Sequence, residues 1–289
     1  MSVPETSAEI YRAIERDGRA ELARPLASVF WSGVAAGIAI SLSVFCEAFL
    51  HRHLPEATWR PVVASLGYSV GFVVVILGRL QLFTEETLTV VLPTVRERTF
   101  SALGVMLRMW AIVFLANMLG TMFAAGATVF GGLQTGEIGE AVLSVSRHFA
   151  RKDGAEAFLH GIPAGFLVAT LVWILPRAGS VGFFAIILMT YMIALGDFSH
   201  VVAGSTEVWL LLFEGEIGPS RAVGGLILPT LAGNVVGGTG LVALLAYEQV
   251  RGELDGDPTH PDNAHARMAD PRTDHSADRP TVHNERTAS

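Results

Sequence analysis

Six apolar stretches follow one another through the middle of the chain, at about 28–50, 61–93, 103–130, 156–176, 181–213 and 222–247. A helix that crosses the hydrocarbon core of a bilayer needs ~20 residues. Four stretches fit one such helix each. The second and the fifth are about 33 residues long, too long for one crossing and too short for two with a turn. The pattern predicts an all-α integral membrane protein with six transmembrane helices.

Polar residues interrupt both of the long stretches. The second is broken by Arg79–Glu86 (RLQLFTEE) and the fifth by Gly196–His200 (GDFSH). Unwound backbone cannot face lipid, because an unpaired N–H or C=O is costly there, so it must pack inside protein or line a wet path. Paired interruptions in the two halves of a chain are typical of transport sites. We therefore expect the second and fifth crossings to consist of two half-helices each.

The two halves of the chain carry a matching motif. Asn117–Gly120 and Asn234–Gly237 both read N-x-x-G, and each asparagine lies 34 positions after a break, counted from Phe83 and from His200. The equal spacing predicts a three-plus-three repeat, and an odd number of helices per half makes that repeat inverted across the membrane. The first stretch of each half also holds a glycine pair that allows close helix approach, Gly33/Gly37 and Gly161/Gly165.

Composition agrees with a membrane protein and excludes several classes. Only 16% of the residues are charged, against about a quarter in a soluble domain, and the mean hydropathy is +0.47. A net charge of −7 without a basic stripe argues against nucleic-acid binding. The single cysteine, Cys46, excludes a disulfide framework and a cysteine-rich metal site. Because no nucleotide-, dinucleotide- or metal-binding motif occurs, we expect no cofactor and no metal.

Polar segments flank the predicted transmembrane domain, residues 28–248. Residues 1–27 mix charges with Ile10, Ile14 and Leu22, which predicts a short surface helix. A small excess of arginine favours a cytoplasmic N-terminus, and six crossings return the C-terminus to the same side. Residues 249–289 are too poor in apolar residues to fold and predict a disordered cytoplasmic tail. Its histidines lack the spacing of a metal site: His260, His265, His275 and His283.

The breaks and their surroundings resemble the formate/nitrite transporter family. The similar segments are LFTEETLT at 82–89, GDFSHVVA at 196–203, Trp110 with Asn117 and Gly120, EAFL at 156–159 with Gly161 and Ile162, LPT at 228–230, and GNVVGG at 233–238. The resemblance covers residues 28–247. It implies an aquaporin-like six-helix protomer, assembled as a homopentamer in the inner membrane with one pore per protomer. It also implies passage of small monovalent anions such as formate or nitrite, or of their conjugate acids.

The resemblance further implies a set of pore residues. The central pore histidine of the family falls on His200, and the Leu-Phe-Thr of the first break falls on Leu82, Phe83 and Thr84. Two apolar slits are expected to flank the histidine, Tyr68, Phe72 and Ile193 on the outer side and Leu82 and Val168 on the inner side.

A histidine in an apolar constriction suits a weak acid. A bare anion is strongly disfavoured there, whereas the neutral acid is not. A desolvated imidazole favours its neutral form and still offers one donor and one acceptor. Thr84 could orient the ring from the opposite break. The alternative is that His200 is structural and only hydrogen-bonds unwound backbone.

The sequence departs from the family pattern at three positions. Ser199 stands where an acidic residue usually precedes the histidine, and Gly204 stands where an asparagine usually follows it. Gly165 replaces an asparagine that often follows the glycine of the fourth crossing. Either the substrate differs from formate or nitrite, or another residue supplies the missing polarity.

Charged residues lie close to both breaks, where Glu85 and Glu86 add further acids. Because an uncompensated charge at membrane depth is costly, we expect Arg79 to pair with Asp197 or Glu207 and so brace the breaks. The alternative is that Arg79 lines the anion path. The full set of expected support residues is Arg79, Asp197, Ser199, Gly204, Glu207, Asn117 and Asn234.

A basic cluster precedes the fourth crossing. Arg147, Arg151 and Lys152, together with His148, would form a vestibule that concentrates anions if their charges are free. The alternative is an ordinary solvated loop.

These observations predict a channel or secondary transporter for a small monovalent anion or its conjugate weak acid, and not an enzyme. Without an ATP site, flux should follow the solute gradient. A neutral-solute pore is the first alternative, because two amides are missing. The others are an intramembrane enzyme with Asp197 or Glu207 opposite His200, and a non-conducting sensor that uses the tail.

Overall fold

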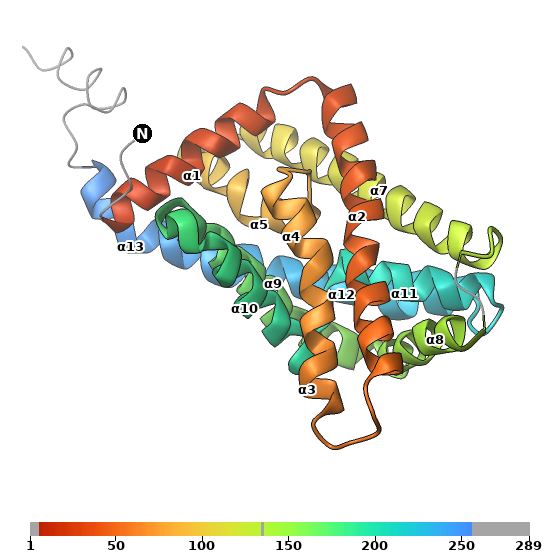
Figure 1. The fold of residues 1–289 in the computed structure, drawn as a ribbon. Helices are drawn as coiled ribbons and strands as arrows, with labels where there is room; N and C mark the ends of the chain where they lie inside the picture. The colour runs from red at the N-terminus through yellow and green to blue at the C-terminus, as the bar shows by residue number, and fades with distance from the viewer. Residues whose placement is uncertain (1–5, 134–135, 256–289) are drawn as a thin grey trace, which may run out of the picture. The chain divides into compact units, whose positions relative to one another are not determined.

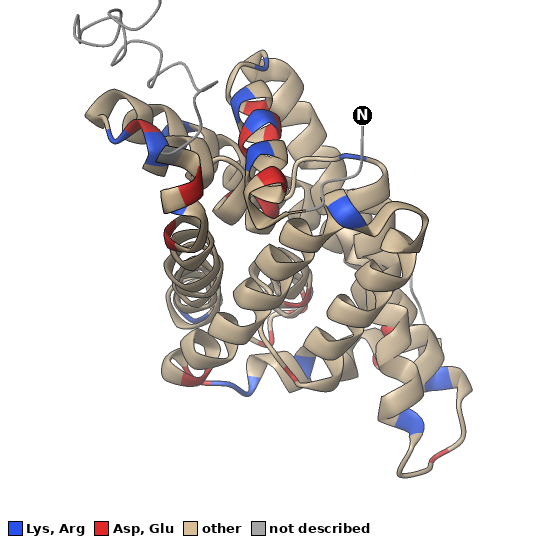
Figure 2. Cartoon of the chain, turned by 90° about the vertical axis from the view of Figure 1, so that its left-hand side faces the viewer, with Lys and Arg blue, Asp and Glu red and all other residues tan. Residues whose placement is uncertain are grey.

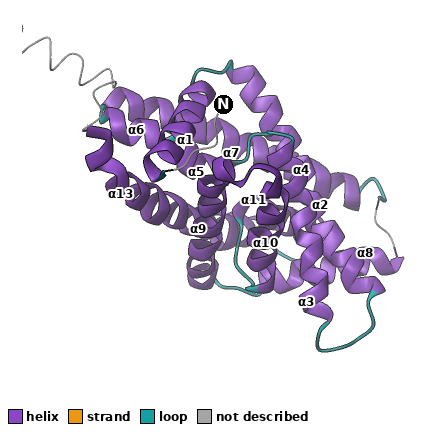
Figure 3. Cartoon of the chain, turned by 60° about the vertical axis from the view of Figure 1, so that its left-hand side comes forward, coloured by secondary structure: helices purple, strands orange, loops and turns teal. Residues whose placement is uncertain are grey.

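The computed structural model describes residues 6–133 and 136–255, and these residues form helices without a strand (Figure 3). Contacts divide the chain after Gln249 into two units, and the second is described only as far as Asp255. The predicted tail beyond that residue, with its four histidines, lies outside the described residues.

The helices follow one another in a simple order (Figure 1). They are α1 Ser7–Leu22, α2 Leu26–His53, α3 Arg60–Ala64, α4 Ser69–Leu77, α5 Phe83–Thr89, α6 Val91–Glu97, α7 Phe100–Val129, α8 Gly136–Ala150, α9 Gly154–Ala178, α10 Gly182–Leu195, α11 Val201–Phe213, α12 Leu228–Val235 and α13 Leu244–Asp255. Short 3₁₀ turns join α3 to α4 and α9 to α10, and π-helical segments, Arg221–Ile227 and Val236–Ala243, flank α12.

Most of the chain is helical and apolar enough to lie in a bilayer. Among the described residues, the runs long and apolar enough to cross one are Leu26–His53, Arg60–Leu77, Phe100–Val129, Gly154–Leu195 and Arg221–Leu254, and Val201–Phe213 is a shorter apolar helix. Most charged residues gather towards the two ends of the long helices (Figure 2). The all-α expectation is confirmed, whereas six crossings in a three-plus-three inverted order stay a prediction.

Two helices are interrupted where the sequence indicated. Backbone at 78–82 separates α4 from α5, and backbone at 196–200 separates α10 from α11. Arg79 and Asp197 both adopt left-handed backbone, with φ of 51° and 53°. Each of them lies three residues before the residue that caps the next helix, Leu82 in the first break and His200 in the second.

A buried asparagine closes each break with the same set of hydrogen bonds. Asn117 on α7 accepts from the Phe83 amide at 2.9 Å and donates to the carbonyls of Gly33 and Gln81, both at 2.8 Å. Asn234 on α12 accepts from the Val201 amide and donates to the carbonyls of Gly161 and Ser199, all at 2.8 Å. The N-x-x-G asparagines therefore satisfy backbone that the breaks leave unpaired.

These contacts correct the alignment of the two halves by one residue. They match Phe83 with Val201, and therefore Leu82 with His200, rather than Phe83 with His200. The distances along the chain from break to asparagine are 34 and 33 residues. The equal spacing read from the sequence resulted from choosing Phe83 instead of Leu82 as the counterpart of the histidine.

Glycines let the crossing helices touch. A Cβ on Gly37 would lie 2.3 Å from the Asn117 carbonyl oxygen, and a Cβ on Gly165 would lie 2.2 Å from the Asn234 carbonyl oxygen. Real Cβ atoms do not approach so closely, so both positions require glycine. Gly165 therefore serves the contact of α9 with α12, and its place there explains why no amide side chain stands at this position.

The two short helices outside the long apolar ones are both packed. The predicted surface helix is α1, which begins with a capping box of Thr6 and Glu9. It buries Tyr11, whose hydroxyl donates to the Leu92 carbonyl at 3.0 Å. The segment interpreted as a loop before the fourth crossing is instead helix α8, which lies beside α2 and α11 (Figure 1). Its amphipathic spacing buries Val142, Ser146 and Phe149.

The asparagine contacts generate a first prediction. Asn117→Ala and Asn234→Ala should each lower the apparent Tm of the purified protein by a similar, large amount. Each backbone group left buried without a partner costs about 1–3 kcal/mol. The measurement is loss of the folded oligomer on heating, followed by size-exclusion fluorescence.

Thr128→Val is the matched control, because the Thr128 hydroxyl donates only within its own helix, to the Ala124 carbonyl at 2.8 Å. A Tm for either asparagine variant as high as that of Thr128→Val would show that the asparagines do not hold the breaks.

Candidate functional site

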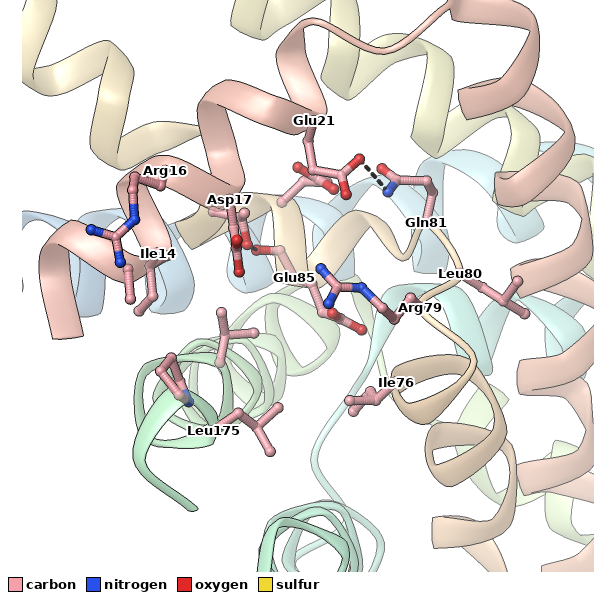
Figure 4. A pocket seen from close by; sticks show the side chains of 15 residues that line it. Ile14, Arg16, Asp17, Glu21, Ile76, Arg79, Leu80, Gln81, Glu85 and Leu175 are labelled. Carbon is pink, nitrogen blue, oxygen red and sulfur yellow. Dashed lines mark hydrogen bonds between the residues drawn. The ribbon is translucent and has the colours of Figure 1, made fainter. Parts of the chain in front are cut away.

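Two cavities enter the chain from opposite sides of the breaks. The α8-side cavity, about 510 Å³, is lined by groups from α2, α8, α10, the second break and α11, among them Glu47, Tyr68, Phe149, Asp197, Phe198 and Glu207. The α1-side cavity, about 450 Å³, is lined by α1, α4, the first break, α5 and α9, among them Glu21, Arg79, Gln81, Glu85 and Leu175 (Figure 4).

A fully buried set of side chains connects the two cavities. Tyr68, on the α8-side cavity, packs its ring 5.5 Å from Phe72, and Phe72 packs 4.9 Å from the His200 ring. His200 contacts Thr84, whose neighbour Glu85 lines the α1-side cavity. Phe72, His200 and Thr84 are each at most 1% exposed, and the other expected slit residues, Leu82, Val168 and Ile193, are equally buried.

His200 makes two hydrogen bonds that define its state. As the N-cap of α11, its Nδ1 accepts from the Ala203 amide at 3.2 Å, and its Nε2 lies 2.7 Å from the Thr84 hydroxyl. In a neutral ring the hydrogen then stands on Nε2, which donates to Thr84. The positive end of the α11 dipole acts against a second proton. His200 thus binds backbone, as the structural alternative requires, and also reaches Thr84 on the opposite break.

Phe83 does not lie with the other expected pore residues. Its ring packs edge-on against Trp110 and Phe114, at 5.6 and 5.3 Å, and its amide binds Asn117. The one-residue shift between the halves explains this, because Leu82 rather than Phe83 occupies the position that matches His200.

The expected pairing of Arg79 with Asp197 or Glu207 is wrong. Asp197 and Glu207 line the α8-side cavity, whereas Arg79 lines the α1-side cavity, where Glu85 attracts it (Figure 4). Asp197 instead binds the Lys152 ammonium at 2.8 Å and lies 3.3 Å from His148 Nε2. Arg79 and Asp197 hold equivalent positions, but the cavities they line lie on opposite sides of the breaks.

The expected basic vestibule is also wrong, because its cations are already engaged. Arg147 makes a double hydrogen bond to Glu216, at 2.8 and 2.6 Å, and lies 3.4 Å from Glu140. The Arg147 hydrogen bonds lower the pKa of Glu216 below its usual range. Arg151 contacts His148, and Lys152 is 6% exposed and bound to Asp197. The solvated-loop alternative fails as well, since Arg147 and His148 lie in the last turn of the packed helix α8 and Lys152, just after it, is buried.

Comparison with known proteins decides the family. A model of the formate/nitrite transporter family matches residues 8–248. The chain belongs to this family.

Individual relatives agree with the formate/nitrite transporter assignment. The chain is 37% identical to the inner membrane protein YfdC of Escherichia coli strain K12 over 252 residues, which are 87% of the chain and 81% of YfdC. It is 30% identical to the formate channel FocA of Haemophilus influenzae over 188 residues, which are 62% of the chain and 64% of FocA. This formate/nitrite transporter family member is therefore a membrane transport protein and not an enzyme.

Solved structures show the same fold. A pentameric formate channel with formate bound aligns with a TM-score of 0.66 at 19% identity, covering 78% of the chain and 98% of that structure. An FNT family ion channel aligns with a TM-score of 0.70 at 22% identity, covering 84% and 98%. The helical, aquaporin-like membrane fold that the family resemblance implied is confirmed.

Phe149 fills the space next to Gly204, one of the positions where the chain departs from the formate/nitrite transporter pattern. A Cβ on Gly204 would lie 2.6 Å from Cζ of Phe149, whose ring reaches in from α8. The Lys152 ammonium stands 5.0 Å from the centre of the same ring. In the space that an asparagine side chain would occupy in the family pattern, this chain has the ring of Phe149, which makes a cation–π contact with Lys152.

Sequence reasoning missed two residues that line the α8-side cavity, Glu47 and Phe149. Glu47 had a visible signal, because it is an acid inside the first apolar stretch, among FCEAF. Phe149 had none, since only the packing of α8 carries its ring to the second break. Ser199, in contrast, was singled out, and its hydroxyl is buried without a hydrogen-bond partner among the described residues.

The Phe149 contact generates a second prediction. Gly204→Ala should lower the Tm of the purified transporter, since overpacking costs about 1–3 kcal/mol. In a Phe149→Ala background the same change should cost much less, because the opposing ring is gone. A double-mutant cycle of thermal melts measures the difference. Gly240→Ala is the control, because its added Cβ would lie 4.0 Å from Val236 Cγ1, an ordinary van der Waals contact. Equal costs in both backgrounds would contradict the contact.

Proposed function

We propose that this transporter passes a small monovalent anion of the formate or nitrite type together with a proton, as the conjugate weak acid. The pore runs within each protomer from one cavity to the other, past His200 and Thr84, and the protomers form a homopentamer in the inner membrane. The single observation that carries this proposal is the buried His200–Thr84 hydrogen bond of 2.7 Å between two cavities. FocA, a formate channel, and the pentameric formate channel structure support the substrate class and the assembly.

The fully buried apolar residues proposed to line the pore favour a neutral solute. Phe72, Leu82, Val168 and Ile193 offer no hydrogen bond, so an anion that loses its water there pays a large desolvation cost. A carboxylic acid or nitrous acid avoids that cost. In the neutral His200 state, Thr84 accepts from Nε2, so its own hydroxyl hydrogen is free to donate to an oxygen of the passing acid.

Both cavities carry carboxylates, which also favours the protonated solute. Glu47, Asp197 and Glu207 line the α8-side cavity with Arg147 and Arg151, which are engaged by Glu216 and by His148. The α1-side cavity is lined by four acids and two arginines, namely Asp17, Glu21, Glu85 and Glu86 with Arg16 and Arg79. Like charge repels an approaching anion, whereas a neutral acid is not repelled.

Flux measurements in proteoliposomes provide the third prediction. Formate uptake at fixed total concentration should rise about tenfold for each unit of pH lowered, as the neutral fraction of the acid rises. Thr84→Val should reduce uptake about tenfold, because a buried donor on His200 loses its acceptor and the loss is about 1–3 kcal/mol. Thr84→Ser keeps the hydroxyl and should retain uptake, and His200→Ala should change its rate and pH dependence.

The matched control is His53→Ala, an exposed histidine that bonds only within its own helix, to the Phe49 carbonyl. Uptake of a neutral solute alone would replace this proposal with a neutral-solute pore. A folded oligomer that conducts nothing would favour the sensor alternative. Pentamer formation is measured separately, by native mass spectrometry.

A further inference from the structure

We propose that the α8-side cavity holds a binding site for a small ammonium cation, formed by Glu47, Glu207 and Tyr68. This site lies in the cavity at one end of the proposed pore, and its occupant is a cation rather than the acid that passes His200. It rests on groups of the cavity that have no partner of their own.

The cavity contains three carboxylates, and only one of them forms an ion pair with a lysine side chain. Asp197 binds the Lys152 ammonium at 2.8 Å. Glu47, from α2, and Glu207, from α11, line the same cavity and make no hydrogen bond or ion pair with any described residue. The two carboxylates also repel each other, while Lys152 attracts Glu207. A bound cation would balance the charge of Glu47 and Glu207, as Lys152 balances the charge of Asp197.

An unpartnered hydroxyl supports the site independently of the acids. Tyr68 lines the cavity, is 7% exposed, and its hydroxyl makes no hydrogen bond within the described chain. Glu207 is equally buried, at 7%. Polar groups on side chains this buried are normally hydrogen-bonded. Both residues line the cavity from different helices, so their polar atoms can be satisfied there by a ligand that donates hydrogen bonds.

The other cations around this cavity are engaged elsewhere. Arg147 is bound by Glu216 and Glu140, and Arg151 contacts His148. His148 itself lies 3.3 Å from Asp197, and His51 lines the cavity on α2. Because the arginines have their own partners, they do not neutralise Glu47 and Glu207.

The walls suit an ammonium better than a metal ion. Aromatic rings of Tyr68, Phe149 and Phe198 line the cavity beside the carboxylates, and an ammonium combines hydrogen bonds to oxygen with attraction to ring faces. Lys152 shows both interactions on the same wall, at 2.8 Å from Asp197 and 5.0 Å from the Phe149 ring centre. A volume of about 510 Å³ leaves room for a methyl substituent.

Calorimetry on the purified full chain in nanodiscs tests the site. Ammonium chloride and methylammonium chloride are titrated separately at constant ionic strength, with sodium chloride as the competing salt and no formate present. Both ammonium salts should bind saturably. Glu47→Gln and Glu207→Gln should each weaken binding at least tenfold, and Tyr68→Phe several-fold. Glu140→Gln, an exposed acid outside this cavity, should leave binding unchanged.

Three results would overturn the site: heats that do not saturate, binding that survives both glutamine variants, or sodium binding as tightly as ammonium. If Glu207→Gln does not fold, the half-buried Glu47 and the ring-preserving Tyr68→Phe still decide the matter. Since the assay needs no transport, an absence of formate flux would count against the proposed function and leave this result readable.

Discussion

Inside a bilayer every backbone N–H and C=O must find a partner within the protein, because hydrocarbon offers none. Asn117 and Asn234 meet this constraint at the two breaks, each with one accepted and two donated hydrogen bonds. With the freed backbone satisfied, the chain can begin α5 and α11 in its interior. That is where Thr84 and His200 meet, so the chemistry of the proposed pore depends on two amide side chains that bind only backbone.

The two halves share a scaffold and differ in chemistry. Leu82 and His200 hold equivalent positions, one apolar and one able to donate and accept a hydrogen bond. Arg79 and Asp197 are likewise equivalent, yet one lines the α1-side cavity and the other the α8-side cavity. The shared backbone of the two halves positions these residues, and the different side chains at equivalent positions give each cavity its own charge.

Sequence patterns located the apolar helices, both breaks and the two asparagines, whereas the pairing of His200 with Thr84 was suggested by the family resemblance. These follow from hydropathy, from backbone hydrogen bonding and from local motifs, all of which lie in short segments. The patterns failed where packing between distant segments decides. The Arg79 pairing assumed that nearby breaks face one space, and the basic vestibule ignored Glu216, which lies 69 residues from Arg147. The ring of Phe149 over Gly204 depends on the fold of α8, which no local pattern encodes.

Left-handed backbone at Arg79 and Asp197 has an energetic consequence. That conformation costs a residue with a side chain about 1–2 kcal/mol, and glycine would avoid the cost. Both positions nevertheless carry a charge, and each follows a glycine directly, Gly78 and Gly196. At both positions a charged side chain therefore stands on a backbone that glycine would adopt more cheaply. Replacing either residue by glycine would relieve the backbone strain and remove a charge from the cavity that the residue lines.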